Sequence, residues 1–158
     1  MTGRGGAVTR REAFRLGAGG MVVALMPLPA FATDDETAGA IREMFGNVLP
    51  QQGRVELTLP TLAETGNSVP ITVAVDSPMS EADHVRRVAI FANRNPRPLI
   101  ASVAFSAKAG KAAFTTNMRL NGTQDVIVLA EMNDGSLWQT QKRVMVTVGA
   151  CDALQTRF

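Results

Sequence analysis

The interval between apolar residues changes once along the chain, near Arg54. Between Ala38 and Val48 apolar residues recur every three or four positions, and after Arg54 they recur at every second position. The first interval is typical of a helix with one apolar face, and the second is typical of a strand with one buried face. The pattern therefore predicts one short helix followed by an all-β domain.

The predicted helix lies near residues 35–47. Thr33 and Glu36 have the spacing of a capping box, in which the threonine caps the first turn and the glutamate binds back to the cap. Glycine and proline favour the end of a helix. The expected apolar face consists of Ala38, Ile41, Phe45 and Val48, and the expected end consists of Gly46, Asn47 and Pro50.

The alternating part predicts seven strands separated by Gly-, Asn- and Pro-containing turns. Asn133-Asp134-Gly135-Ser136 is a typical hairpin turn, because Asp-Gly tolerates the positive φ that such turns require. Many short strands of this kind predict an immunoglobulin-like antiparallel β-sandwich, here without the cysteine pair of antibody domains. The predicted strands are 55–59, 69–75, 85–91, 99–105, 111–118, 125–132 and 137–148.

The N-terminal residues 1–32 have the pattern of an export signal. Arg10-Arg11 resembles the paired arginines of a twin-arginine signal, and an apolar run of about 13 residues follows, shorter than the ~20 residues of a membrane span. Ala30-Phe31-Ala32 predicts cleavage after Ala32 and a periplasmic location. The predicted segments are therefore a signal peptide (1–32), a helical segment (33–50), a sandwich (51–148) and a C-terminal arm (149–158).

Removing the signal reverses the sign of the net charge. The chain has 16 basic and 14 acidic residues, and the signal contains four arginines and one glutamate. The remaining 12 basic and 13 acidic residues give no excess of positive charge, so we predict neither a nucleic-acid nor a membrane partner.

The sequence contains no motif for catalysis or for a cofactor. His84 is the only histidine, and one histidine without nearby cysteine or histidine is a poor metal site. A triad of Cys151, His84 and Asp83 has no local signature. We therefore predict a protein that is not an enzyme, with no cofactor, no metal and no catalytic residue, in which His84 is a loop residue.

Five methionines follow the predicted cleavage site: Met44, Met79, Met118, Met132 and Met145. Thioethers suit Cu(I), so a copper-binding periplasmic domain is one open hypothesis. None of these residues has the close spacing of a copper motif, and adaptable packing in the core is the simpler interpretation. Trp138, after the predicted hairpin, is interpreted as a core or edge aromatic.

Cys151 is the only cysteine and follows the last predicted strand. In an exported protein a single cysteine is a free thiol, an intermolecular bond or a covalent attachment point. Burial as a small apolar residue is the alternative interpretation. Asp152 disfavours the thiolate, because a neighbouring anion opposes a second one.

Segments along nearly the whole chain resemble the SoxY family, the Y subunit of the periplasmic Sox sulfur-oxidation carrier. They are Arg54–Leu57, Glu64–Pro70, Val75–Met79, Ile90–Pro98, Arg119–Leu120, Thr123–Val126, Asp134–Trp138 and Val146–Cys151. The resemblance implies an immunoglobulin-like domain that pairs with a Z subunit. It also implies that Cys151 carries sulfur species covalently on a flexible arm containing Gly149 and Ala150.

The family resemblance implies three further partners: a cytochrome that conjugates thiosulfate to the cysteine, a hydrolase that releases sulfate, and a dehydrogenase. The carrier itself catalyses none of these steps. In the family the arm ends in Gly-Gly-Cys-Gly-Gly, whereas here Asp152 follows the cysteine and the chain continues to Phe158. A second hypothesis is therefore a scaffold or interaction subunit with the same fold that carries no sulfur.

Overall fold

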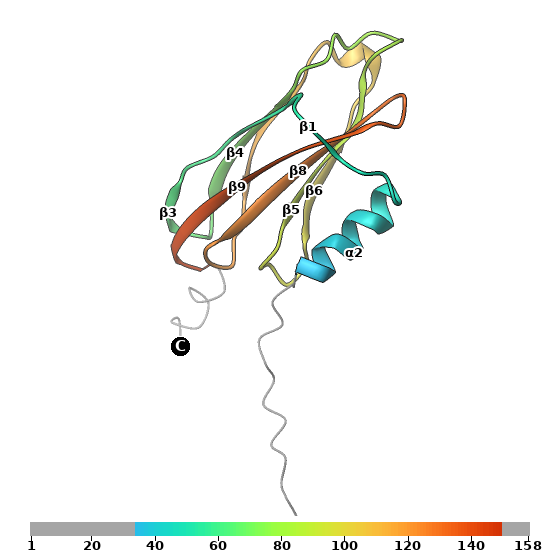
Figure 1. Cartoon of the computed structure of the whole chain (residues 1–158). Coiled ribbons are helices and arrows are strands. Elements are labelled where there is room, and N and C mark those ends of the chain that lie inside the picture. Colours follow the sequence, from blue (N-terminus) through green and yellow to red (C-terminus); the bar gives the residue numbers. More distant parts are fainter. Residues whose placement is uncertain (1–33, 150–158) are drawn as a thin grey trace, which may run out of the picture.

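A computed structural model of the protein describes residues 34–149, which form two β-sheets with one helix packed against the outside (Figure 1). None of the helices in this range is long and apolar enough to cross a membrane. The elements are α2 (Asp34–Phe45), β1 (Gln51–Gln52), β2 (Val55–Thr58), β3 (Leu62–Thr65), β4 (Val69–Val75), β5 (Val85–Ala92), β6 (Leu99–Ala104), the 3₁₀ turn η1 (Ala107–Ala109), β7 (Ala112–Met118), β8 (Gln124–Met132) and β9 (Leu137–Val148).

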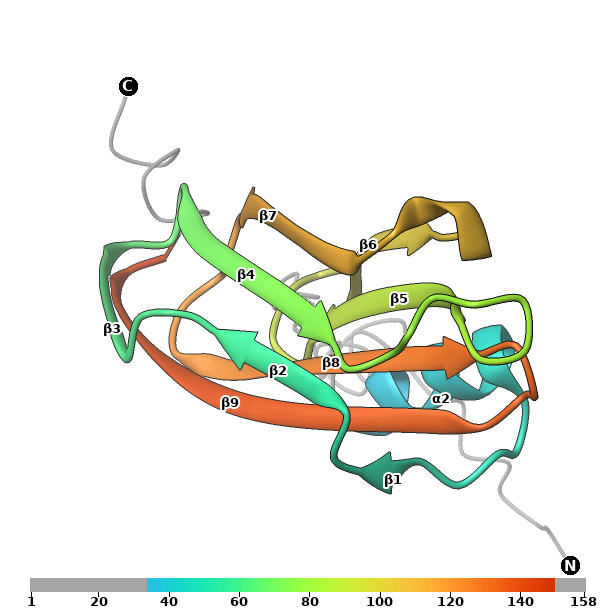
Figure 2. The same ribbon diagram turned by 90° about the horizontal axis from the view of Figure 1, so that it is seen from above.

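The larger sheet has the strand order β1-β9-β8-β5-β6, and β3 also pairs with β9. The smaller sheet has the order β2-β4-β7. Figure 2 shows β2 and β4 lying across the larger sheet, as expected for a sandwich. All seven predicted strands and the predicted all-β sandwich are therefore confirmed.

Two strands were not predicted, and both break the expected antiparallel pattern. β1 and β3 pair with β9 in parallel, in the registers Gln51↔Trp138 and Leu62↔Met145. β1 has two residues, and no residue of β3 is fully buried, so neither has the alternation by which a strand is recognised. β3 pairs with the part of β9 that continues past the end of β8, whose first residue pairs with Val144.

The core lies between the two sheets and consists of alternate residues on each strand. In β4, residues 69, 71, 73 and 75 are buried while the residues between them are exposed or half-buried. β8 is buried on both faces over its middle, because one face meets the core and the other meets α2. The alternation in the sequence thus corresponds to the two sides of each sheet.

Helix α2 covers the outer face of the larger sheet (Figure 1). Buried residues of the sheet contact partly buried residues on one side of the helix. Val48, predicted to belong to this face, is instead exposed because the helix ends three residues earlier. The contacting residues are Ala89, Phe91, Leu129 and Leu137 from the sheet, with Ala40, Ile41, Met44 and Phe45 from the helix.

The predicted end of the helix at glycine is confirmed. Gly46 has φ +72°, and its N–H donates to the carbonyl of Arg42 at 2.8 Å. This is the left-handed residue that commonly ends a helix, where glycine has no Cβ to clash. The predicted cap residue Thr33 lies outside the described residues.

Two glycine substitutions should therefore change stability in opposite directions. Gly46→Ala should lower the free energy of unfolding by about 1 kcal/mol, because alanine is strained at positive φ. Gly39→Ala, inside the helix with no atom within 4 Å of an added Cβ, should raise it by about 0.5–1 kcal/mol. Urea unfolding of both variants measures the two changes. Equal effects of the two substitutions would contradict this account of the helix end.

Candidate functional site

The sequence places the candidate chemistry after β9, so the last residues of this strand form the base of the predicted arm. We call this side of the sandwich the arm end. Gly149, the last described residue, is buried where β9 ends. Ala150 and Cys151 lie outside the described residues. The described structure therefore includes the base of the predicted arm, up to Gly149.

Two neighbouring turns bind the final residues of β9. The hydroxyl of Thr123 accepts a hydrogen bond from the N–H of Val146 at 3.0 Å and donates to the carbonyl of the same residue at 3.4 Å. The carbonyl of Val148 accepts from the N–H of Gly66 at 2.7 Å, and Gly66 in turn accepts from the N–H of Leu120 at 2.8 Å. These bonds hold the base of the arm up to Val148.

A buried amide beside Thr123 holds the β7–β8 turn in place. Gln124, 1% exposed, accepts a hydrogen bond from the N–H of Arg94 and donates to the side-chain oxygen of Asn95, both at 2.9 Å. Asn95 also accepts from the N–H of Asn121 at 2.9 Å and donates to the carbonyl of Arg119 at 2.8 Å. Buried polar groups in native proteins are nearly always hydrogen-bonded, and both of these side-chain amides are. The two amides thus connect the β5–β6 and β7–β8 turns at the arm end.

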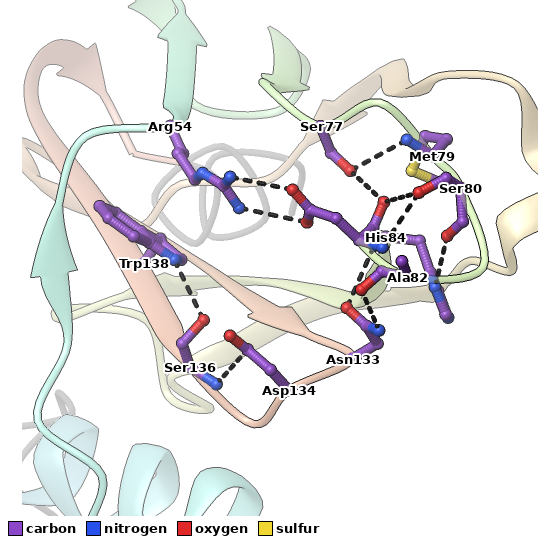
Figure 3. A network of polar contacts seen from close by, with 11 residues as sticks. Arg54, Ser77, Met79, Ser80, Ala82, His84, Asn133, Asp134, Ser136 and Trp138 are labelled. Carbon is purple, nitrogen blue, oxygen red and sulfur yellow. Dashed lines mark hydrogen bonds and ion pairs between the residues drawn. The ribbon is translucent and has the colours of Figure 1, made fainter.

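The opposite end of the sandwich has a second polar cluster around the β8–β9 hairpin (Figure 3). Arg54 makes two hydrogen bonds with the carboxylate of Asp83, at 3.0 and 3.3 Å, and its guanidinium lies 5.4 Å from the ring centroid of Trp138. This ring packs against the core, which confirms its prediction as a core or edge aromatic. The contact is a cation–π interaction in addition to an ion pair.

Electrostatics at this hairpin follow from its hydrogen bonds. The hydrogen bond to Asp83 raises the pKa of the Arg54 guanidinium above its usual value. Hydrogen bonds from the side chain and then the backbone of Ser136 lower the pKa of the Asp134 carboxyl. A carboxyl with a lowered pKa stabilises the fold at neutral pH and loses that effect only as pH falls through its folded-state value. Both shifts favour the charged forms of Arg54 and Asp134.

His84 belongs to this cluster and lies in a loop, as predicted. Its Nδ1 is 2.9 Å from the carbonyl oxygen of Ser80. Its backbone N–H donates to the side-chain oxygen of Asn133, and its carbonyl accepts from the N–H of Asn133. Within residues 34–149 no group of three or more His, Cys, Asp and Glu side chains is placed to hold a metal ion. The ring is thus part of a loop contact in the described structure.

The methionines are distributed as packing residues with one exception. Met79, Met118 and Met132 lie in the core, and Met44 packs between helix and sheet. Met145, predicted as core, is instead 56% exposed because it points to the outer face of β9. It pairs with Leu62 of β3, which is 59% exposed. These two residues place exposed apolar surface beside the base of the arm.

A match to a protein-family model shows the family of this chain. The model of the family "Sulfur oxidation protein SoxY" matches residues 41–151. The chain belongs to the SoxY family. The match covers the sandwich and ends on Cys151, the residue that the resemblance in the sequence assigns to sulfur.

A solved SoxY structure has the same fold. The sulfur carrier protein SoxY from Chlorobium limicola f thiosulfatophilum is 27% identical, with a TM-score of 0.61, and the alignment covers 72% of this chain and 97% of that chain. A superoxide reductase (neelaredoxin) from Ignicoccus hospitalis is 19% identical, with a TM-score of 0.54 over 74% of this chain and 95% of that one. This second likeness shows a shared fold. No curated protein matches the chain by sequence.

Sequence reasoning did not identify the amides that support the arm end. Asn95 and Gln124 lie in segments that resemble the family, but no local pattern indicates that their side chains meet. The available signal was a polar residue at a core-facing position, because Gln124 precedes Val126 and Val128 on the inner side of β8. Arg54 marks the change of the apolar interval and begins a segment that resembles the family, and neither signal indicates its ion pair with Asp83.

Proposed function

We propose that this protein is a periplasmic sulfur carrier that holds sulfur intermediates covalently on Cys151. The observation that carries the proposal is the extent of the family match, which ends at the only cysteine of the chain. The solved relative named a sulfur carrier protein supports the same role. The bonds that fix Val146 and Val148 support it physically, because a covalent arm needs a firm base.

Loading of Cys151 with thiosulfate needs an external oxidant that accepts two electrons. The Cys151 thiolate and the outer sulfur of thiosulfate form an S–S bond, giving a cysteine S-thiosulfonate and releasing two electrons. A partner cytochrome accepts these electrons one at a time. Disulfide-type bonds form and break by thiolate attack, which suits a reversible attachment.

Unloading needs a second partner and no oxidant. Water attacks the terminal sulfone, the S–S bond to that sulfone breaks, and sulfate and two protons leave. A cysteine persulfide remains on the arm. A hydrolase would catalyse this step and a dehydrogenase would oxidise the remaining sulfur, so the carrier is a substrate of its partners and not itself an enzyme.

Export and pairing complete the proposal. The Arg10-Arg11 signal supports export by the twin-arginine route with cleavage after Ala32. Membership of the family supports a Z-type subunit as the partner in a heterodimer. The exposed Leu62–Met145 pair beside the arm end supports a protein contact there, because surface apolar residues in contact often belong to interfaces.

Intact-protein mass spectrometry tests the proposal. After incubation with thiosulfate and the oxidising cytochrome, the chain should gain the mass of one thiosulfate, and peptide mapping should place it on Cys151. Chain treated beforehand with N-ethylmaleimide is the control and should gain nothing more. An adduct on any other residue, or none with an active cytochrome, would refute covalent carriage on this thiol.

A scaffold that carries no sulfur is the second candidate. It is favoured by the seven residues after Cys151, which lie beyond the family match. A chain with this altered end could keep the fold and the pairing surface while the thiol has no role. Substitution of Cys151 by serine separates these two functions.

A further inference from the structure

A cavity of about 320 Å³ lies at the arm end between the first turn of α2 and the outer face of the larger sheet. It belongs to neither the amide pair at Gln124 nor the hairpin cluster. Its walls come from α2, the β5–β6 turn, β8 and β9, and one side is apolar. The lining residues are Asp34, Thr37, Ala38, Ile41, Asn93, Asp125, Ile127 and Gln141.

Thr37 is the unexplained residue of this cavity. Its side chain is 2% exposed, and its hydroxyl oxygen has no hydrogen-bond partner. A buried hydroxyl left unpaired costs about 1–3 kcal/mol, so native structures seldom keep one. Because Thr37 lines the cavity, a group bound there can complete the missing hydrogen bond.

The cavity walls are held in position by Asn93. Its amide donates to the carboxylate of Asp34 at 2.9 Å, and its oxygen accepts from the N–H of Asp125 at 3.1 Å. One side chain therefore ties the start of α2 to the start of β8. The cavity is a preformed feature of the fold, as small-ligand sites usually are.

The charges favour a cation with several donors. Two carboxylates, Asp34 and Asp125, line the cavity, and no basic residue does. The N-terminus of a helix carries about half a positive charge, which two carboxylates exceed. Arg143 lies 3.8 Å from Asp125 with a side chain that is 67% exposed, so it leaves acceptor capacity on that carboxylate.

We propose that this cavity binds the guanidinium group of an arginine side chain. A planar guanidinium has five donors, which suits two carboxylates, the Thr37 hydroxyl and the Gln141 amide oxygen together. The aliphatic part of the arginine lies against Ile41 and Ile127. The arginine comes either from a partner protein or from Arg157 of the chain itself, eight residues beyond Gly149. Extended chain of that length spans about 26 Å, as far as β9 runs back from Gly149 to Gln141.

NMR titration of the full chain with N-acetylarginine amide tests the site. Backbone signals of Thr37 and Asn93 should shift and saturate in the millimolar range. N-acetyllysine amide should bind several-fold more weakly, because an ammonium is a point charge without the fork. Absence of saturable shifts, or stronger shifts of the same signals with sodium sulfate, would overturn the proposal.

Three variants sharpen the test. Thr37→Val should weaken binding about fivefold, the value of one hydrogen bond, without lowering the melting temperature. Asp125→Asn should weaken it more. Asp35→Asn is the matched control, since this acid is in the same helix turn but does not line the cavity, and should change affinity less than twofold. Equal losses in Asp35→Asn and Asp125→Asn would mean general charge attraction and would refute the site.

Arg157→Gln identifies the source of the arginine. If Arg157 occupies the cavity, this variant shifts the Thr37 and Asn93 signals before any probe is added and binds the probe more tightly than the unchanged chain. If both chains have the same spectra and affinity, the arginine belongs to another protein. This comparison distinguishes the two sources, and neither result depends on whether Cys151 carries sulfur.

Discussion

A Cys151→Ser chain is expected to carry no sulfur and to abolish thiosulfate oxidation in cells that depend on it. A serine hydroxyl forms no S–S bond, so the loading step has no attachment atom. The mass gain seen with the unchanged chain should disappear entirely. Sulfate production by the cells should fall to the level of a strain lacking the gene. Both effects are losses of the whole signal.

The matched control for this substitution is Ala150→Ser. It introduces the same side chain one residue earlier and leaves the thiol in place, so loading should continue. Circular dichroism of both variants should be unchanged, because each lies after the last strand. Normal sulfate production with Cys151→Ser would show that the thiol has no role and would support the scaffold function. Sulfur loading that persists in vitro would refute the attachment site itself.

Strands such as β2 and β4 could be predicted because burial alternates along them. Residues 69–75 show the pattern most clearly, with every second side chain in the core. β1 and β3 could not be predicted, because each is held by pairing with β9 rather than by its own buried face. β3 pairs with β9 where β9 continues past β8, whereas β1 pairs with the edge of β9 opposite β8. Such long-range pairing has no local sequence signal.

The sequence predicted the hairpin end of the sandwich better than the arm end. The hairpin at Asp134-Gly135 was predictable, since its turn chemistry is local and Gly135 has φ +83°. The amides at the arm end were not, because Gln124 and Asn95 are 29 positions apart and meet only through the fold. The cavity at Thr37 likewise depends on residues from α2, β8 and β9.

Gln124→Ala is expected to be the most destabilising substitution at the arm end, lowering the free energy of unfolding by about 2–4 kcal/mol. It removes the partner of the Arg94 N–H and of the Asn95 side-chain oxygen and leaves a small cavity in place of a side chain that is 1% exposed. Urea unfolding measures the change. Gln52→Ala, an exposed glutamine in β1, is the control and should stay within 0.5 kcal/mol of the unchanged protein.

The same variant should loosen the base of the arm before the fold as a whole. Gln124 fixes the turn that contains Thr123, and Thr123 binds both backbone groups of Val146. Hydrogen exchange at Val146 should therefore accelerate more than exchange in the middle of β4, which belongs to the other sheet. Uniform acceleration at both places would mean that Gln124 stabilises only the whole domain. Faster exchange confined to the arm end, with Cys151 still loaded at a normal rate, would show that the amide positions the arm and takes no part in its chemistry.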